Sequence, residues 1–309
     1  MKAPALSAKL PRTLSRLLDV RDEIMGEGEP DDLRFLHAVL AQCGLPYRAP
    51  PDEVRDYQRQ NGRATLILQS GFLIDPATSQ PSLQGLPYGV RPRLLLIHLC
   101  SQALRRTSPI IPISDSMSGL MKELGLAVTG GRQGTIRAFK EQLNRLAAAR
   151  MQLLFASDDR AAMLNTSPIS RFDVWFPTDS RQRMLWPSEV RLSQDFYESL
   201  QAHALPLDPR SIRALQHSAR ALDCYTWLAH RLPRIRAGAG EPVSWQSLHR
   251  QFGGDLAQMK FFRREFLRAL RQAAAAYPTA RIEEIDTGLR LHRSPPPIAP
   301  RTTIAKANA

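Results

Sequence analysis

The chain has 309 residues, a formal net charge of +13, and a hydrophobic fraction of 43%. That fraction supports folded cores and excludes a wholly disordered chain. No run in the sequence approaches the roughly 18 uncharged apolar residues that a membrane span needs, and the first residues lack the apolar stretch of a secretory signal, so we expect a cytoplasmic protein without a membrane partner. The cysteines lie too far apart in sequence for a disulfide framework or a CxxC pair, and they are Cys43, Cys100 and Cys224.

The positive charge is concentrated in the later two thirds of the chain. Residues 1–90 carry a net charge of −1, residues 91–205 carry +5, and residues 206–309 carry +9. The end of the chain, from residue 294 onward, contributes only Arg301 and Lys306 to this excess. The charge therefore belongs to folded segments, and this distribution indicates a polyanionic partner.

Residues 1–90 are predicted to form an N-terminal segment that serves a partner or dimerisation. The apolar spacing predicts one helix over 10–25 and a second over 31–44, where an aspartate can cap the start and a glycine can end the helix. Residues 64–74 are apolar and β-branched, which predicts a strand or hairpin. Residues 79–89 are rich in Pro, Gly and Ser, which is typical of an exposed linker, so we place the first domain boundary here.

Residues 91–205 are predicted to form a first winged helix-turn-helix domain. Three helical segments precede polar loops and β-rich segments, which is the order of elements in that motif. The predicted elements are a helix at 91–106, a short helix capped by Ser114 or Ser116 and ending at Gly125, a turn at 129–134, a helix at 135–150, and strands at 151–157, 171–177 and 183–193.

Residues 206–293 repeat this order and predict a second winged-helix domain, followed by a disordered tail at 294–309. The fold class expected is mainly α with small β wings, that is α+β, with tandem winged helix-turn-helix domains behind the N-terminal segment. The predicted elements are a helix at 209–232, a short helix at 243–254, a basic helix at 256–277 capped by Asp255, and a hairpin at 280–293 that turns at Thr287-Gly288.

The helix predicted at 135–150 separates apolar from polar side chains. Ile136, Phe139 and Leu143 form the apolar stripe, and the opposite side holds residue types that suit base edges and phosphates. Glu141 lies on that side as well and opposes a DNA contact, and an ordinary solvated face is the alternative interpretation. The residues expected to contact DNA come from the turn before the helix and from its polar side. They are Thr129, Gly130, Arg132, Gln133, Arg137, Lys140 and Asn144.

The helix predicted at 256–277 is more sharply divided. Residues 256–272 include five basic side chains and one acid, Glu265, while Met259 and Phe262 begin an apolar stripe and Leu267 points outward. A solvated face is the alternative for one such helix, but two basic helices, each after a glycine turn and before a hairpin, favour DNA binding. The residues expected to contact DNA are Lys260, Arg263, Arg264, Arg268 and Arg271.

The hairpins after these helices are candidate wings along the DNA backbone. In the second hairpin the acidic residues would repel phosphate, so we expect only its flanks to touch DNA. The candidate residues are Arg171, Arg181 and Arg183 in the first hairpin, and Arg281, Arg290 and Arg293 in the second, where Glu283, Glu284 and Asp286 oppose them.

No enzyme signature is present in the sequence. The glycine turn at 129–134 lacks the lysine of a phosphate-binding loop, and Gly238-Ala239-Gly240 lacks the third glycine of a dinucleotide site. The seven histidines are dispersed, without an HxH or HExxH pair. We therefore expect no catalytic residue, no cofactor and no metal ion. An enzyme such as a metal-dependent nickase or recombinase is the least favoured function, after the two binding functions described below.

Five segments, taken in order, are similar to those of a known family. The segments are LPYGVRPRLLLIHLCSQALR (86–105), MSGLMKELGLAVTGGRQGTI (117–136), LDCYTWLAHRL (222–232), VSWQSLHRQFG (243–253) and YPTARIEEIDTGLRLHRSPPP (277–297). Together they resemble the plasmid-encoded RepA replication initiator family, with similarity from Leu45 to Pro297. Residues 1–44 match least.

This resemblance implies an initiator that binds directly repeated double-stranded DNA at a plasmid origin. It further implies recruitment of the host replication initiator and the replicative helicase, with repression of its own promoter as an additional role. It adds no catalytic residue, since initiators of this type are neither nucleases nor ATPases. The TGG turn of the family corresponds to Thr129, Gly130 and Gly131.

A dimeric winged-helix transcriptional repressor with one functional reading helix and no replication role is the alternative function. The sequence leaves open whether the active form is a monomer or a homodimer. It also leaves open the DNA repeat and the host protein that is contacted.

Overall fold

The computed structural model describes residues 12–26, 28, 30–75, 78–113, 116–131, 134–156, 161–172 and 189–298. Within these residues the chain forms helices and five small antiparallel sheets. This mixture agrees with the predicted α+β class. No helix in the described part of the chain is long and apolar enough to cross a bilayer.

A first unit, residues 90–192, contains three helices and a three-stranded sheet. The last strand of the unit, β10, lies between the other two and pairs antiparallel with both. Ser116 caps the second helix, as predicted, because its hydroxyl accepts a hydrogen bond of 3.0 Å from the Gly119 N–H. The elements are α3 (Val90–Arg106), β6 (Ile110–Pro112), α4 (Met117–Glu123), α5 (Thr135–Ala148), β9 (Ile169–Phe172) and β10 (Glu189–Leu192).

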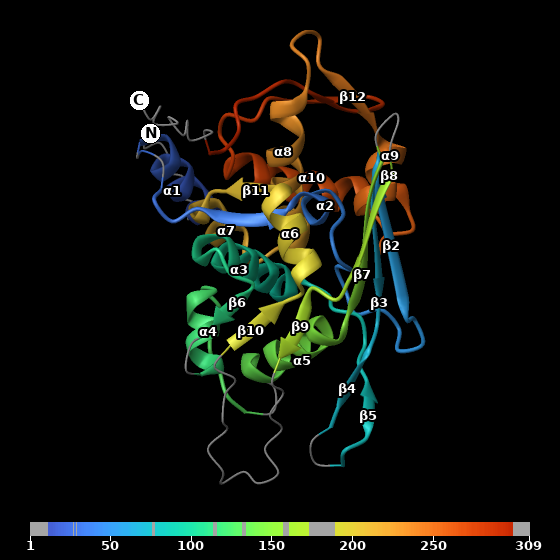
Figure 1. Cartoon of the computed structure of the whole chain (residues 1–309). Helices are drawn as coiled ribbons and strands as arrows, with labels where there is room; N and C mark the ends of the chain where they lie inside the picture. Colours follow the sequence, from blue (N-terminus) through green and yellow to red (C-terminus); the bar gives the residue numbers. More distant parts are fainter. Residues whose placement is uncertain are drawn as a thin grey trace, which may run out of the picture.

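A second unit, residues 219–291, has a similar order of elements, except that in the first unit β7 (Arg150–Ala156) and β8 (Ala161–Thr166) stand between α5 and β9. Its last strand, β14, again lies between the other two strands of a three-stranded sheet. Figure 1 shows α4 and α5 in the lower half of the molecule and the elements of the second unit in the upper half. These elements are α8 (Ala219–Arg231), β12 (Glu241–Ser244), α9 (Trp245–Phe252), α10 (Met259–Ala275), β13 (Ile282–Ile285) and β14 (Gly288–Leu291).

Strands from residues 1–90 pair with strands from later in the chain. One two-stranded sheet joins β1 to β11, and a four-stranded sheet has the order β2-β3-β7-β8. Because these sheets and the core are shared across residues 90 and 205, the division of the chain into three separate domains stays a prediction. The strands are β1 (Arg34–His37), β2 (Asp56–Asn61), β3 (Ala64–Gln69), β7 (Arg150–Ala156), β8 (Ala161–Thr166) and β11 (Ala204–Leu207).

Three predicted elements differ from the structure. The helix expected over 31–44 is β1 followed by the short α2 (Ala38–Gln42), because β1 pairs with β11 instead of coiling. The linker expected over 79–89 contains β5 (Pro81–Leu83), which pairs with β4 (Phe72–Ile74). The helix expected over 209–232 is two helices, α7 (Pro209–Leu215) and α8, because Ser218 caps a new helix.

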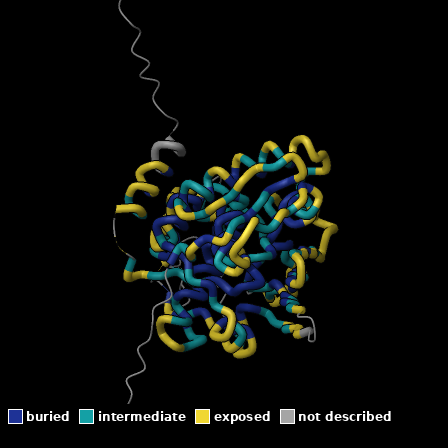
Figure 2. The backbone as a smooth tube through the Cα atoms, turned by 90° about the horizontal axis from the view of Figure 1, so that it is seen from above, coloured by how far each residue is buried: buried dark blue, intermediate teal, exposed yellow. Residues whose placement is uncertain are grey.

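A continuous hydrophobic core runs through all of these parts. Figure 2 shows the buried segments gathered at the centre of the molecule and the exposed segments around them. Fully buried aromatic side chains come from α5, from α6 (Gln194–Ala202) and from the second unit. Each such side chain contributes about 1.5–3 kcal/mol of transfer free energy. Those aromatic residues are Phe139, Phe196, Tyr225, Phe262, Phe266 and Tyr277.

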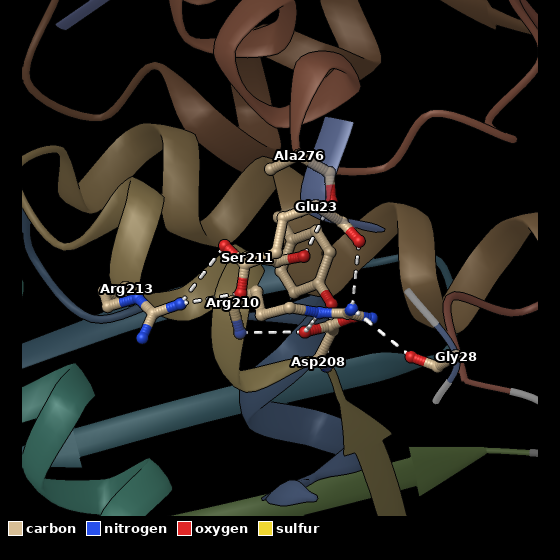
Figure 3. A network of polar contacts seen from close by, with 8 residues as sticks. Glu23, Gly28, Asp208, Arg210, Ser211, Arg213 and Ala276 are labelled. Atoms are coloured by element: carbon tan, nitrogen blue, oxygen red, sulfur yellow. Dashed lines mark hydrogen bonds and ion pairs between the residues drawn. The ribbon is translucent and has the colours of Figure 1, made fainter. Parts of the chain in front are cut away.

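The N-terminal helix α1 (Arg12–Gly26) is held by two arginines of α7 (Figure 3). Arg210 binds the carboxylate of Asp208 at 2.8 Å and donates to the backbone carbonyl oxygens of Glu23 and Gly28, each at 3.3 Å. Arg213 donates to the Glu23 carboxylate at 3.1 Å. Because these carbonyl groups lie at and beyond the C-terminal end of α1, the two arginines fix that end to α7.

Candidate nucleic-acid interface

The turn before α5 is closed by a reciprocal pair of threonines. The Thr129 N–H donates to the Thr135 hydroxyl at 2.8 Å, and the Thr135 N–H donates to the Thr129 hydroxyl at 3.0 Å. A Cβ atom at Gly134 would lie 2.4 Å from the carbonyl oxygens of Thr129 and Gly130, so this position requires glycine. The turn therefore presents the exposed Thr129 and Gly130 at the N-terminal end of α5. The other two predicted turn residues, Arg132 and Gln133, lie outside the described residues.

The predicted polar face of α5 is only partly exposed. Arg137 is exposed, whereas Lys140 is half-buried and burial lowers the pKa of its ammonium group. Asn144, predicted on an exposed DNA side, is only 8% exposed, so its predicted exposure was wrong, and its contact with DNA stays a prediction. The physical reason is that α5 packs against α3, α4, β4 and β9, which bury more than one apolar stripe.

Arg145, in the last turn of α5, packs against neighbouring segments of the chain. Its guanidinium binds the Glu141 carboxylate at 2.8 Å, donates to the Leu86 carbonyl oxygen at 3.1 Å, and lies 5.2 Å from the ring centre of Tyr88. Segment 86–88 therefore crosses this side of the helix. The potential DNA-contacting surface of α5 is limited to its first turns, around Arg137.

The basic face of α10 is open to solvent. Lys260, Arg264, Arg268 and Arg271 are all exposed, and Arg263 is half-buried with its guanidinium 4.3 Å from the Trp245 ring. On the opposite side, the apolar stripe is buried as predicted, except that Met259 at the start of the helix is 36% exposed. Leu267, which was predicted to point outward, instead packs against the core. The burial follows from the position of α10, which packs against α7, α8 and α9 and holds the stripe Phe262, Phe266, Ala269, Leu270 and Ala273.

The carboxylate of Glu265 is near two of these cations. It lies 3.2 Å from Arg264 Nε and 3.8 Å from Arg268 Nη1, and both arginine side chains are at least 70% exposed. Exposed pairs of this kind contribute between nothing and about 1 kcal/mol. A phosphate can therefore replace Glu265 as the partner of these arginines at little cost.

Asp255 has a different role from the predicted helix cap. The helix begins at Met259 with Gln258 as its N-cap residue, and Asp255 instead pairs with Arg220 and, at 3.4 Å, with Arg48. This ion-pair group ties the loop before α10 to α8 and to the N-terminal segment.

Arg59 of β2 connects the four-stranded sheet to the second unit. It is 5% exposed and donates from Nη1 to the Arg250 carbonyl oxygen at 3.0 Å, near the end of α9. A Cβ atom at Gly254 would lie 2.7 Å from its Nη2 atom, so the turn before α10 closes directly on this guanidinium. In the same sheet, β7 follows α5 after one residue and pairs with β3, which pairs with β2. This sheet thus links the end of α5 to the start of α10.

The two hairpins differ in charge. In the first hairpin Arg171 and Arg191 lie directly opposite each other on neighbouring strands and are both exposed. In the second hairpin Arg290 pairs with Glu283 at 3.3 Å. Arg281 and Arg293 are exposed, and Arg181 and Arg183 lie outside the described residues.

Buried histidines and cysteines have ordinary structural surroundings. Burial lowers the pKa of His98 and of His230 to about 4, and it raises the pKa of Cys43 and Cys100 to about 12. Among the described residues, no three His, Cys, Asp or Glu side chains are grouped in a way that could hold a metal ion. The expected absence of a metal and of a cofactor stays a prediction.

Comparison with solved structures finds domains 2 and 3 of RctB, with 11% sequence identity and a TM-score of 0.48 over 82% of this chain and 96% of that chain. No curated protein sequence matches this chain. The family model described as plasmid-encoded RepA protein matches residues 86–247, which is more than half of the chain. This range includes the whole of the first unit, with its glycine turn and α5, as well as α8 and β12. The chain therefore belongs to the family of plasmid-encoded RepA proteins.

Proposed function

We propose that this protein is a plasmid replication initiator that binds repeated double-stranded DNA sequences at the origin. The observation that carries this proposal is the exposed cationic face of α10, on a chain whose family is that of plasmid-encoded RepA proteins. A row of guanidinium and ammonium groups on one helix face is the electrostatic pattern of a DNA-binding surface. The residues of this face are Lys260, Arg264, Arg268 and Arg271, with Arg263 at its edge.

We also propose that both units act as winged helices, with α5 and α10 as the reading helices. In each unit a short helix and a turn precede the reading helix; a hairpin follows α10 directly, and the pair β9–β10 follows α5 after β7 and β8. A reading helix enters the major groove with its N-terminal residues, and two such helices joined by one scaffold can occupy successive grooves, about 10 base pairs apart. The contact of Arg59 with the Arg250 carbonyl supports a fixed spacing between them.

The proposed function has three further parts, which follow from the family. The bound protein recruits the host replication initiator and the replicative helicase, and it represses its own promoter. It carries out these steps without a catalytic site of its own, in the cytosol where the plasmid lies. Incubation of supercoiled origin DNA with the protein and Mg²⁺ should accordingly leave the DNA without a site-specific nick.

DNase protection and transformation test the proposal together. The protein should protect a set of repeats in the plasmid DNA that flanks its gene. A fragment with these repeats should establish a plasmid when the gene is supplied and should fail without it. Absence of any protected region at low salt would refute DNA binding, and protection without plasmid establishment would refute the replication role.

A dimeric transcriptional repressor is a second candidate because of one observation. The burial of Asn144 and the partial burial of Lys140 reduce the polar face of α5, so among the described residues α10 presents the more complete reading face. A repressor should protect an operator near its promoter and fail in the transformation experiment.

A further inference from the structure

A cavity of about 380 Å³ lies where the four-stranded sheet, α6 and the end of α8 come together. Its wall includes Ala64 of β3 and Ala202, the last residue of α6, and these small side chains leave the space open. The second unit contributes His230 of α8 and Arg234 of the short helical turn that follows it. Small-molecule sites have volumes of about 300–1,000 Å³, so this cavity is large enough for one small ligand.

The lining of this cavity is cationic. Arg63 and Arg234 contribute guanidinium groups, and none of the described residues that line the cavity is an aspartate or a glutamate. Arg234 donates from Nη1 to the His230 carbonyl oxygen at 2.6 Å, and its other N–H groups have no hydrogen-bond partner in the described part of the chain. Partial burial lowers the pKa of Arg234, and no carboxylate among the described residues offsets this shift. An anion in the cavity therefore meets a cation whose charge the fold leaves uncompensated.

The cavity also contains a pair of stacked rings. The centres of the His203 and Phe155 rings are 5.0 Å apart and their planes are 26° apart. His203 is held at the end of α6 because its Nδ1 donates to the Ser199 carbonyl oxygen at 2.9 Å. His203 is exposed and Phe155 is half-buried, so a further planar ring can stack on this pair.

The half-buried imidazole of His230 supplies a polar group beside these rings. Its nitrogens have no hydrogen-bond partner among the described residues. Burial, together with Arg234 and Arg231, lowers the pKa of His230 to about 4, so the ring is neutral near pH 7. A neutral imidazole offers one donor and one acceptor, which are the groups that the edge of a nucleobase requires.

We propose that this cavity binds a free nucleotide, with its phosphates on Arg63 and Arg234 and its base stacked on His203. Guanidinium groups without a neighbouring carboxylate select an anion, and their N–H groups match the oxygens of a phosphate. The stacked rings and the neutral imidazole select a planar heterocycle. The nucleotide is bound without chemical change, as an effector that joins the four-stranded sheet to the second unit. This proposal does not depend on DNA binding.

Isothermal titration calorimetry of the full chain tests this site with ADP, GDP, CDP and UDP. At pH 7.5 and about 0.15 M salt, at least one of them should bind with a dissociation constant below about 1 mM. The corresponding nucleoside and inorganic pyrophosphate should each bind at least about tenfold more weakly, because each uses only one part of the site. Absence of binding by all four diphosphates, or equally tight binding of pyrophosphate, would overturn the proposal.

The chain offers matched variants for both parts of the site. Arg234→Gln keeps an amide donor for the end of α8 and should weaken binding of the diphosphate about tenfold or more, whereas Arg236→Gln, in an exposed loop, should not change it. His203→Ala should weaken binding, and His203→Phe, which keeps a ring, should retain it. Equal effects within either pair would refute the proposed contacts. All four variants should unfold near the temperature of the natural chain, since the exchanged side chains are exposed.

A competition experiment distinguishes a free nucleotide from an unpaired nucleotide of DNA. A single-stranded oligonucleotide of about 12 residues is added to the protein before the diphosphate is titrated. The heat of diphosphate binding should be retained, because the cavity holds one nucleotide. Its loss at an equimolar amount of oligonucleotide would assign the cavity to unpaired DNA and overturn the proposal.

Discussion

Arg93 of α3 and Asp223 of α8 form a buried, bidentate ion pair between the two units. Arg93 Nε lies 2.7 Å from one carboxylate oxygen of Asp223, and Nη2 lies 2.8 Å from the other. The remaining N–H groups of Arg93 donate to the backbone carbonyl oxygens of Leu45, Pro46 and Gly89. The guanidinium is therefore satisfied by three parts of the chain, and it fixes α3, α8 and the N-terminal segment to one another.

Removal of one partner of this pair should strongly destabilise the protein. Asp223→Ala leaves an uncompensated guanidinium with a side chain only 6% exposed, which costs about 3–5 kcal/mol in the free energy of unfolding. Glu241→Ala, which removes an exposed pair with Arg231, is the control and should cost less than about 1 kcal/mol. Urea unfolding followed by circular dichroism measures both, and equal effects would contradict the importance of burial.

The cations of α10 should contribute to the salt dependence of DNA binding. If Lys260 and Arg271 each neutralise a phosphate, their replacement by alanine should reduce the slope of log K against log salt by about 0.9 each. Arg236→Ala, in an exposed loop before β12, should leave the slope unchanged. Fluorescence anisotropy at several salt concentrations gives the slopes. Unaltered slopes in both α10 variants would show that this face does not meet the DNA backbone.

Arg137 and Asn144 should behave differently, although both stand on the predicted polar face of α5. Arg137 is exposed, so Arg137→Ala should reduce the discrimination between the repeat and random DNA by about 1–3 kcal/mol if the contact is bidentate. Asn144 is buried, so Asn144→Ala should lower stability and leave discrimination unchanged. Competition binding and thermal unfolding separate these effects. A loss of discrimination in the Asn144 variant would mean that α5 rotates when DNA binds.

Acid should destabilise the protein through His37. Burial, together with the nearby His203, lowers the pKa of His37 to about 3, and its Nδ1 atom accepts a hydrogen bond of 3.2 Å from the Val39 N–H in capping α2. The unfolded chain takes up a proton near pH 6.5, whereas the folded chain does so only near pH 3. The contribution of the neutral His37 to the free energy of unfolding is therefore fully present above about pH 6.5. It is lost progressively as the pH falls from 6.5 towards 3.

The variant His37→Asn keeps a side-chain acceptor for the cap and removes the titration. Between pH 7.5 and pH 5, the free energy of unfolding of the natural chain should fall by about 2 kcal/mol more than that of the variant. Urea unfolding at the two pH values gives the comparison. The same fall in both proteins would show that other groups cause the acid sensitivity.

The sequence by itself determined the main helices of both units and the basic side of α10, but it did not predict β8 or the place of β7 in the four-stranded sheet. Helical periodicity predicted α3, α5 and α10, Ser116 and the glycine turn predicted the start of α4 and of α5, and Thr287-Gly288 predicted the turn between β13 and β14. These are local features, because caps, turns and one apolar stripe depend on residues within a few positions. The five segments that resemble the family lie between residues 86 and 297. The RepA family model, which matches residues 86–247, confirms that resemblance.

Only the tertiary structure decided which polar side chains are exposed and how the units are joined. On an isolated helix, Asn144 lies opposite the apolar stripe. In the structure α5 is packed on several sides, so a helical-wheel projection with one buried face predicted the exposure of Asn144 incorrectly. Residues 34–37 look helical in isolation and form a strand because they pair with β11, more than 160 residues later. Arg59 and the ion pair of Arg93 with Asp223 join segments far apart in the chain. Such contacts have no local signal, because their free energy depends on partners that only the folded chain brings together.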